Sequence, residues 1–518
     1  MLSSQHRTNE SFFKRHIVGL NAAAQVSPAE ILANLLAAFT LLLLVSLFFP
    51  TNGVYVSPRV TLAFPSLQKI FDVEDNYPGA ISMDCSDRGF FLAEPQQQGR
   101  NSRSVLPLNC SIDDVRALPV QPIEFPRGRE DAMNRILFDL ATLRLPNNRK
   151  LVRILHYGDS QLEADRMSLY LRGELQKEFG GGGVGYVALN PQIPINPTVK
   201  LSLSPEWTVS TPAVKYKGAA PLRVGHLLSN ISIPLRQEKK AWIKVERRQL
   251  KAYPPLRFSR IKVLVSNEVA PIVFEVKTPS QTLYSGVLQP GRGMQQLSVN
   301  MHASRESVTL HFSGSGCPEV YGVGLDYVAG VAVDNIPLRS SSGVDFVKAD
   351  AKMLKKSFDL VGAKLIVLQF GTNVVPKIMN SYSYYEEQLY EQLMLLKRLQ
   401  PDVCILVVGV ADMARRVDGV MASYPNIEKI RDAQKRAAFR AGCAFWDAYQ
   451  AMGGKNSIVS WAYAQPTLAS KDFCHFSATG ATLLAELLYR AIRQEFDRYM
   501  ENMQKSWASS AAASRAKK

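Results

Sequence analysis

The sequence predicts an α/β fold around a parallel sheet, interrupted by an all-β insertion and preceded by one apolar helix. Apolar strand runs alternate with helical spacing at residues 131–199 and 317–500, which predicts a three-layer parallel sheet built from two parts of the chain. Between these parts, residues 200–316 contain short alternating runs separated by turn residues, which predicts a β-sandwich. Residues 31–49 form an uncharged apolar run.

The run at residues 31–49 predicts a transmembrane helix. It contains 19 residues without a charge, and a helix of that length rises about 28 Å, close to the thickness of the hydrocarbon core of a bilayer. Arg7, Lys14 and Arg15 precede it, so the positive-inside rule places residues 1–30 in the cytoplasm. A cleaved signal peptide is the alternative, but no small-residue cleavage motif follows the run. We expect an uncleaved single-pass anchor in the cytoplasmic (inner) membrane, with the remaining chain facing the periplasm or the cell exterior.

The remaining elements follow in the order expected for strand–helix units. Residues 50–130 are rich in Pro, Gly, Ser, Asn and Gln, and predict a loop-rich linker. We expect helices at residues 131–143, 162–179, 385–399, 427–441 and 481–500, and buried strands at residues 151–157, 328–335, 363–370, 403–410 and 444–449. Residues 501–518 predict a disordered, low-complexity tail.

Composition limits the classes of function. The net charge is +16, but lysine and arginine are scattered and form no long basic run, which argues against nucleic acid as a partner. The charge indicates a solvated basic surface, or attraction to an anionic envelope polymer or membrane. The six cysteines include no CxxC pair, so we expect no metal bound by cysteine. We expect no cofactor. Cys85 and Cys110 flank a loop-rich segment and could form a disulfide in an oxidising compartment.

Ser160 lies where a predicted buried strand meets a predicted helix. It follows Gly158 and Asp159 in the sequence LHYGDSQLEADRMS. At such a turn a serine hydroxyl can be presented at the carboxyl end of a parallel sheet, near amide donors at the start of the helix. The tripeptide alone fits an N-cap serine better than it fits a nucleophile.

Two further motifs adjoin predicted elements of the α/β part. Asn373 follows a strand in LIVLQFGTNVV, where its amide can donate to an oxyanion or form an Asx turn. Asp472 and His475 lie three residues apart in KDFCHFSATG. This spacing lets the carboxylate orient the imidazole while the other ring nitrogen faces Ser160. A surface turn and a metal half-site are the alternatives, and no cluster of further ligands favours a metal.

The order of these motifs makes them specific. GDS, GTN and DxxH occur in this order, and the sequence here resembles the SGNH (GDSL-like) hydrolase family over residues 131–199 and 317–500. The resemblance implies a flavodoxin-like three-layer α/β fold and a catalytic triad of Ser160, Asp472 and His475.

The same resemblance implies an oxyanion hole. The Ser160 amide and the Asn373 side chain match the first and third blocks of the family, although the third block reads GTN in place of the more familiar GxND. The second block corresponds to VDNIPLRSSSG, where Ser340 or Gly343 would supply a backbone N–H. Family members often have glycine where this chain has Ser340, and a side chain fits there only if the backbone dihedral angles tolerate it.

A narrower resemblance is to envelope enzymes that act on O-acetyl groups of peptidoglycan and other polysaccharides. The anchor, a β-rich insertion similar to a carbohydrate-binding module, and the segments YGVGLDYVAGVAVDNI and VVGVADM carry this resemblance. It implies a serine esterase that removes O-acetyl groups from a cell-envelope polysaccharide such as peptidoglycan. Two alternatives remain: an O-acetyltransferase that uses the same triad together with a membrane-bound O-acyltransferase, and an inactive glycan-binding protein.

Other polar and aromatic side chains lie near these motifs. His156, two residues before the GDS motif, is expected to be a structural histidine at the end of its strand. Tyr382, Tyr384 and Tyr385 follow Asn373 and fit either stacking against a sugar or the start of an amphipathic helix.

Overall fold

The chain forms two compact units, Met1–Arg100 and Asn101–Lys518. The computed structural model describes residues 54–57, 60–62, 106–190, 197–212, 221–235, 240–248, 257–301 and 307–516. In the first unit, β1 (Val54–Ser57) and β2 (Val60–Leu62) pair as an antiparallel hairpin.

The predicted transmembrane helix at residues 31–49 lies outside the described residues. Within the stretches given above, no helix is both long and apolar enough to span a bilayer. Cys85 also lies outside them, while Cys110 is a buried free thiol. The membrane anchor therefore stays a prediction, whereas the predicted Cys85–Cys110 disulfide is wrong, because the Cys110 thiol is free and buried against apolar side chains.

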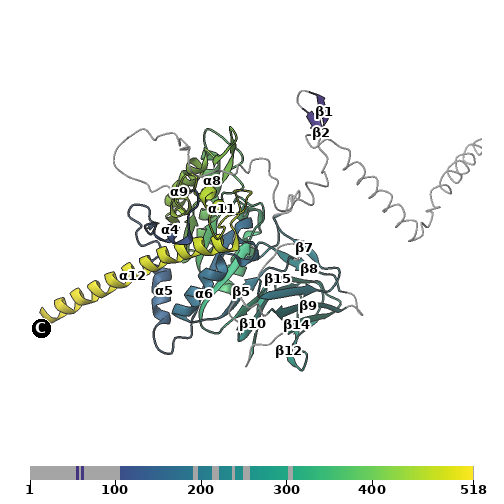
Figure 1. The fold of residues 1–518 in the computed structure, drawn as a ribbon. Coiled ribbons are helices and arrows are strands. Elements are labelled where there is room, and N and C mark those ends of the chain that lie inside the picture. The colour runs from purple at the N-terminus through teal and green to yellow at the C-terminus, as the bar shows by residue number, and fades with distance from the viewer. Residues whose placement is uncertain are drawn as a thin grey trace, which may run out of the picture. The chain divides into compact units, whose positions relative to one another are not determined.

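A six-stranded sheet forms the centre of the second unit (Figure 1). In spatial order its strands are β16 (Gly330–Pro337), β4 (Leu151–Gly158), β17 (Ala363–Gln369), β18 (Cys404–Val408), β21 (Ala444–Trp446) and β3 (Ile123–Glu124). The first five are parallel, and β3 joins the edge in the antiparallel direction. Numbered along the chain, the parallel strands lie in the order 2-1-3-4-5, which is the flavodoxin-like order.

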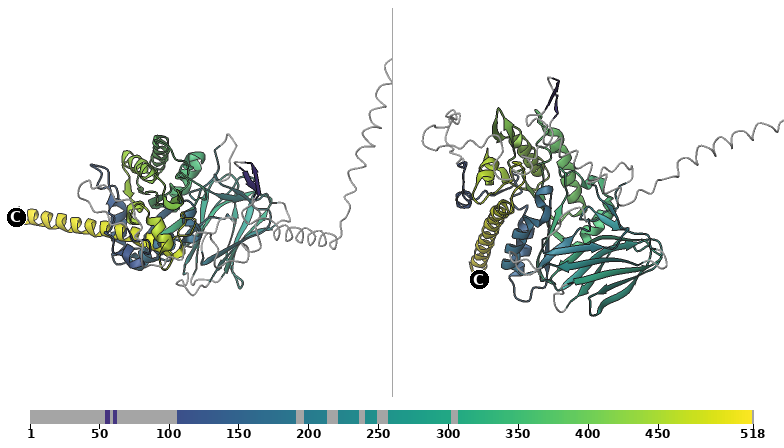
Figure 2. Two further views of the ribbon diagram at one scale, coloured as in Figure 1. Left: turned by 45° about the horizontal axis from the view of Figure 1, so that its top comes forward. Right: turned by 45° about the vertical axis from the view of Figure 1, so that its right-hand side comes forward.

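Helices cover both faces of this sheet (Figures 1 and 2). Its central strands are therefore buried almost throughout, which explains why their sequences are continuous apolar runs. On one face lie α5 (Asn134–Leu143), α6 (Ser168–Phe179) and α12 (Ala478–Ala516). On the other face lie α7 (Ala351–Val361), α8 (Ser383–Leu399) and α9 (Ile427–Arg440). The predicted three-layer arrangement is confirmed.

Several shorter elements complete the α/β domain. They are α4 (Ile112–Arg116), η1 (Ser160–Asp165), η2 (Phe346–Lys348), α10 (Ala448–Ala451), α11 (Ser457–Tyr463) and the hairpin of β19 (Ala414–Val417) and β20 (Val420–Ser423). The hairpin follows β18, so it extends from the carboxyl edge of the sheet.

Two antiparallel sheets form the predicted sandwich. One contains β13 (Gln295–Asn300), β10 (Arg260–Asn267), β15 (Pro318–Asp326), β8 (Asn230–Ser232) and β7 (Thr208–Ser210), with β5 (Gly183–Val187) also paired to β15. The other contains β12 (Thr282–Leu288), β11 (Ile272–Lys277), β14 (Ser307–Gly314), β9 (Lys240–Arg247) and β6 (Val199–Leu203). Apolar side chains from both sheets form one shared core.

The sandwich is larger than the predicted residues 200–316. Both β5 and β15 pair within it, so its strands extend from Gly183 to Asp326. The apolar run of each strand was visible in the sequence, but a run does not reveal which sheet it joins, because strand pairing is set by contacts between distant segments.

Two other predicted boundaries are wrong. The predicted linker at residues 50–130 supplies α4 and β3 to the α/β domain, and Cys110 and Val115 are buried there. The predicted disordered tail at residues 501–518 is helical to Ala516, since α12 continues through it and extends beyond its neighbours (Figures 1 and 2). Its alanine-rich composition has high helix propensity, which the low-complexity interpretation neglected.

A buried ionic cluster joins the sandwich to the parallel sheet. Arg153 of β4 pairs with Asp334 of β16 and, at 2.5 Å, with Asp326 of β15. Lys262 of β10 lies 3.2 Å from Asp326. The ring of Tyr186 lies 4.8 Å from the guanidinium carbon. Because Arg153 and both carboxylates are fully buried, each charge is stabilised by its ionic partners and not by water.

Candidate active site

Three neighbouring strands end at the same level on the carboxyl edge of the sheet. Gly158 of β4 pairs with Pro337 of β16 on one side and with Gln369 of β17 on the other. The chain order reverses at β4, and open α/β sheets bind ligands at such switch points. A side chain at position 158 would meet Leu162 Cδ1 at 2.7 Å and the Gln369 carbonyl at 2.8 Å. Glycine therefore allows the tight turn into the segment that carries Ser160.

Ser160 and His475 meet at this edge. Ser160 is the first residue of η1, and its Oγ lies 2.9 Å from His475 Nε2. The two residues are 315 positions apart in the chain. The predicted continuous helix at residues 162–179 is wrong, because Ala164 and Asp165 have left-handed φ values of 57° and 62° and divide η1 from α6.

Asp472 completes a chain of hydrogen bonds with His475. Its Oδ2 lies 2.7 Å from His475 Nδ1, and its Oδ1 accepts from the backbone N–H groups of Cys474 and His475, each at 3.0 Å. Partial burial opposes ionisation of Asp472, but the hydrogen bonds from the His475 ring and the backbone outweigh it and lower the pKa of the carboxyl. The carboxylate is therefore ionised beside the imidazole.

The loop that carries Asp472 and His475 is closed by its own backbone. Ser470 N–H donates to the His475 carbonyl at 2.8 Å, and Ser477 N–H donates to the Leu468 carbonyl at 3.0 Å. At the start of α12, a side chain on Gly480 would lie 1.8 Å from the Leu468 carbonyl oxygen. Glycine there lets the helix pack directly against the base of the loop.

Gln161 and Arg166 fix this loop against η1, and the sequence analysis missed both. Gln161 donates to the Cys474 carbonyl at 2.7 Å and accepts from Phe476 N–H at 3.3 Å. Arg166 donates to the Ser160 carbonyl at 2.6 Å and to the Phe476 carbonyl at 3.2 Å. Their nearness to Ser160 in GDSQLEADR was the available signal, but only the fold shows that they reach the other loop.

Asp159 links the nucleophile segment to the segment after β17. It is buried, accepts from Gln161 N–H at 3.0 Å and lies close to Thr372. Burial raises the pKa of Asp159 to about 6, although the polar groups of Gln161 and Thr372 oppose the shift. Since Thr372 precedes Asn373, this contact brings the Asn373 segment beside Ser160.

Asn373 and the second-block candidates lie in two segments that are bonded to each other. Asn373 Nδ2 donates to the Ser341 carbonyl at 2.8 Å. Tyr385 donates its hydroxyl to the Ser342 carbonyl at 2.9 Å, and so fixes the same loop from α8. The amide of Asn373 has a second N–H, and the residue is exposed at the carboxyl edge.

The structure distinguishes Ser340 from Gly343. Gly343 N–H donates to Ser341 Oγ at 3.0 Å, so this N–H already has an acceptor within its own loop. Ser340 is exposed and has a φ of 62°, which lies in the left-handed region that favours glycine. The serine therefore adopts the backbone conformation that a glycine would have at this position.

His156 lies in the interior beneath this edge. Its Nε2 lies 3.1 Å from Gln369 Oε1, and its Nδ1 lies 2.9 Å from Ser168 Oγ. Burial lowers the pKa of His156 to about 4. The ring is therefore neutral and hydrogen-bonded on both nitrogens, as expected of a structural histidine.

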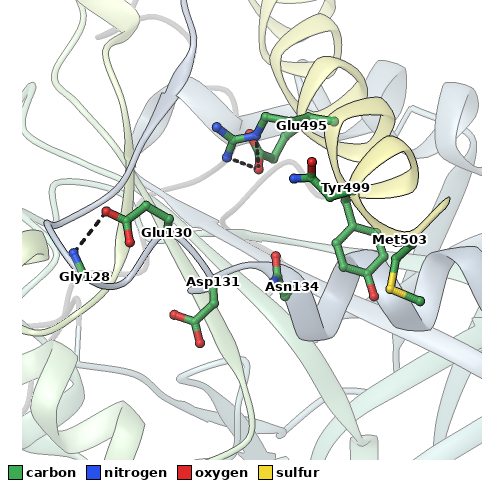
Figure 3. A pocket seen from close by; sticks show the side chains of 9 residues that line it. Gly128, Glu130, Asp131, Asn134, Glu495, Tyr499 and Met503 are labelled. Carbon is green, nitrogen blue, oxygen red and sulfur yellow. Dashed lines mark hydrogen bonds and ion pairs between the residues drawn. The ribbon is translucent and has the colours of Figure 1, made fainter. Parts of the chain in front are cut away.

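A cavity of about 510 Å³ lies elsewhere, between α12 and residues 128–134 (Figure 3). It is lined by Gly128, Glu130, Asp131, Asn134, Glu495, Arg498, Tyr499, Asn502 and Met503. α12 begins just after His475, and Glu495 lies roughly 25 Å further along the helix axis. This cavity is therefore separate from the Ser160 site.

Comparisons with known proteins identify a solved structure with a similar fold but no protein with a similar sequence. No family model and no curated protein matches the sequence. The structure is similar to that of a peptidoglycan O-acetylesterase, with a TM-score of 0.58 and 19% identity over 73% of this chain and 99% of that chain. At this identity the likeness establishes a shared fold and nothing further.

Two weaker likenesses have TM-scores too low to support an argument. A salicylyl-acyltransferase from a tetracycline biosynthetic pathway has a TM-score of 0.26 and 10% identity, covering 60% of this chain and 97% of that chain. A family two carbohydrate esterase from Clostridium thermocellum has a TM-score of 0.23 and 9% identity, covering 52% of this chain and 95% of that chain.

Proposed function

We propose that the chain is a serine esterase that removes O-acetyl groups from a cell-envelope glycan such as peptidoglycan. The observation that carries the proposal is the hydrogen-bonded series Ser160–His475–Asp472 at the switch point of the sheet. The fold shared with a peptidoglycan O-acetylesterase supports the choice of an acetylated glycan as substrate.

In the proposed mechanism Ser160 Oγ attacks the acetyl carbonyl while His475 Nε2 takes its proton. His475 then gives that proton to the departing sugar hydroxyl, which leaves an acetyl group on Ser160. A water molecule attacks the acyl-enzyme with His475 again as base, and acetate is released. The ionised Asp472 holds the ring orientation and stabilises the imidazolium in both steps.

Three donors are proposed to hold the oxyanion. They are the Ser160 N–H, the Ser340 N–H and the free N–H of the Asn373 amide. We choose Ser340 over Gly343 because the N–H of Gly343 donates to Ser341 Oγ, whereas Ser340 has the backbone conformation of the family's glycine. Gln161 and Arg166 act as positioning residues, since they hold the His475 loop against η1.

Exposure favours hydrolysis over acetyl transfer. The side chains of His475 and Asp472 are 38% and 48% exposed, so water reaches the reacting groups. A transferase must exclude water from its acyl-enzyme. A glycan-binding protein without activity would have no need of the hydrogen-bonded triad, and the sandwich is instead proposed to bind the glycan for the esterase.

The proposed location follows from the sequence alone. Residues 31–49 would anchor the protein in the cytoplasmic membrane, with the esterase on the outer side. Extraction of membranes at alkaline pH tests the anchor, because an integral helix stays in the membrane pellet. Release of the full-length protein by this treatment would refute it.

Labelling and product analysis test the esterase itself. The full-length protein should react with a fluorophosphonate probe and release acetate from O-acetylated peptidoglycan. Ser160→Ala should abolish both, while Ser383→Ala, an exposed serine at the start of α8, should abolish neither. Absence of labelling and of acetate release in the wild type would refute the esterase, and transfer of acetyl to an added glycan would establish the transferase.

A further inference from the structure

Lys471 adjoins the triad carboxylate and is held over an aromatic ring. Its Nζ lies 3.4 Å from the centre of the Tyr463 ring, and Tyr463 is 43% exposed. The Tyr463 ring in turn lies 6.1 Å from that of Phe473, measured between centres. Because Lys471 immediately precedes Asp472 in the chain, this cation lies at the start of the loop that carries Asp472 and His475.

Two more cations on the same edge are held in the same way. Lys377 lies four residues after Asn373, and its Nζ is 5.7 Å from the ring centre of Tyr384. Arg415 lies in the hairpin after β18, and its guanidinium carbon is 5.6 Å from the ring centre of Tyr424. Both are therefore ordered by an aromatic side chain at a position that follows a strand of the parallel sheet.

Lys377, Arg415 and Lys471 are called the rim cations below. They come from the segments after β17 and β18 and from the loop before α12. The hairpin that carries Arg415 is hydrogen-bonded to the loop that carries Asp472 and His475, because Ala414 N–H donates to the Phe473 carbonyl at 3.0 Å. The rim cations therefore belong to loops at the same carboxyl edge of the sheet as the Ser160–His475 pair.

The rim cations differ from other ring-bound cations in having no carboxylate partner. Elsewhere in the described part of the chain, each cation over a ring also pairs with an acid: Arg144 with Glu178, Arg153 with Asp326, Arg431 with Asp447, Lys435 with Glu124, Arg440 with Glu387, Arg493 with Asp497 and Arg498 with Glu495. None of the rim cations forms an ion pair with a carboxylate within those same described residues. An aromatic ring attracts a cation without neutralising it, so these three charges remain available.

We infer that the rim cations bind carboxylates of an acidic glycan, so that the proposed esterase acts on an anionic polymer whose charged sugars adjoin the acetylated one. Side chains already ordered on a ring lose less conformational entropy on binding than free lysines or arginines. Uncompensated charge around the site also raises the local concentration of an anionic polymer. This inference rests on the proposed function for the acetyl group, and on the rim for the charge of the polymer.

The ratio of activities on two probes tests the inference. One probe is an O-acetylated oligogalacturonide, which has a carboxylate on each sugar, and the other is an O-acetylated cello-oligosaccharide, which is neutral. In the full-length protein, the combined variant Lys377→Gln, Arg415→Gln and Lys471→Gln should lower the acidic-to-neutral ratio of kcat/KM by about tenfold, mainly through KM. The salt dependence of that ratio should weaken as well.

Arg440→Gln is the matched control. Arg440 lies 4.2 Å from the ring centre of Tyr390 but pairs with Glu387, so its removal should leave the ratio as in the wild type. A triple variant with the wild-type ratio would overturn the inference. Calorimetric binding of the oligogalacturonide to Ser160→Ala, with and without the rim substitutions, tests the rim without catalysis. If the wild type released no acetate but the rim substitutions abolished binding of the oligogalacturonide, the role of the rim cations would be retained and the esterase would be rejected.

Discussion

A histidine–aspartate pair occurs twice in this domain, in opposite surroundings. His475 Nδ1 lies 2.7 Å from Asp472 Oδ2, and the two side chains are 38% and 48% exposed at the carboxyl edge of the sheet. His226 Nε2 lies 3.6 Å from Asp334 Oδ2, and both side chains are completely buried where the sandwich meets the sheet. The residue types are the same in both pairs, and only the surroundings differ.

Burial separates the roles of the two pairs. Burial lowers the pKa of His226, which therefore stays neutral. Burial also opposes ionisation of Asp334, but Arg153 and His226 outweigh it and lower the pKa of that carboxyl. A buried imidazole gains a proton only at a desolvation cost, whereas the side chain of His475 is 38% exposed, so substrate and water can reach it. On the proposed function, we therefore expect proton transfer at the His475–Asp472 pair and structural support from the buried pair.

Replacing each histidine tests this division, with the largest effect on the exposed side. His475→Ala should lower the rate of acetate release by about ten-thousandfold or more, because Ser160 loses its base. Its thermal unfolding should stay close to that of the wild type, since the side chain of His475 is only partly buried. Acetate assays and calorimetry measure the two effects. His226→Ala should instead lower the melting temperature and largely keep the rate of acetate release. Equal loss of activity in the two variants would contradict the different roles of the two pairs.

Removing the central cation of the buried cluster is the next largest change. Arg153→Met leaves Asp326 and Asp334 buried with their main counter-charge gone, which should cost about 3–5 kcal/mol of unfolding free energy. Denaturant titration measures the loss. Arg135→Met is the control, because Arg135 makes only an exposed ion pair with Asp402, and surface pairs contribute little. Equal stability of the two variants would contradict the structural role.

The proposed oxyanion donor on the exposed side should have a smaller effect than His475. Asn373→Ala should lower kcat by about a hundredfold with little change in KM, because an oxyanion hydrogen bond forms fully only in the transition state. Steady-state kinetics on an aryl acetate separate the two constants. Asn134→Ala, in the remote cavity of Figure 3, should change neither constant. A rise in KM alone for Asn373→Ala would indicate that the residue only positions the Ser341 loop.

The smallest effect per pH unit concerns two buried groups on either side of Gly158. The pKa of His156 is lowered to about 4, so the unfolded chain binds more protons below pH 6.5 and the native state loses stability as the pH falls toward 4. The pKa of Asp159 is raised to about 6, so its contribution has the opposite sign and falls as the pH rises from 3.8 to 6.

His156→Gln separates these contributions. Relative to the wild type, the variant should gain roughly 1.4 kcal/mol of unfolding free energy for each pH unit below 6.5, down to about pH 4. Asp159→Asn should instead gain relative stability as the pH rises from about 4 to 6. Urea titrations at several pH values measure both slopes. If the unfolding free energies of the wild type and of His156→Gln changed equally with pH, the His156 ring would not be buried as a neutral group.

Much of the fold was predictable because its signals are local. The buried runs of β4, β17 and β18 and the spacing of α8 and α9 lie within single elements, so periodicity sufficed to locate them. Most failures involve contacts between distant segments. The break at Ala164 and Asp165 has a nearer cause, because Asp165 forms a buried ion pair with Arg172, seven residues further on, that a helical pattern does not reveal.

The candidate site shows the same limit. The motifs indicated Ser160, Asn373, Asp472 and His475 because each follows a strand or precedes a helix. They did not indicate Gln161 or Arg166, whose role depends on carbonyl groups more than 300 residues away. They also did not distinguish the two second-block candidates, since the proposed choice rests on the φ of Ser340 and on the hydrogen bond of Gly343 N–H, which the motifs do not show.

The sequence by itself determined the types and the order of the reactive groups, the parallel-sheet pattern and the inserted sandwich, because these depend on residue identity and short-range periodicity. The tertiary structure alone decided which histidine faces Ser160, which second-block N–H donates within its own loop, and which cations in the described part of the chain pair with a carboxylate. The physical reason is that burial and hydrogen-bond partners arise from packing between segments far apart in the chain, and desolvation then sets the charge of each group.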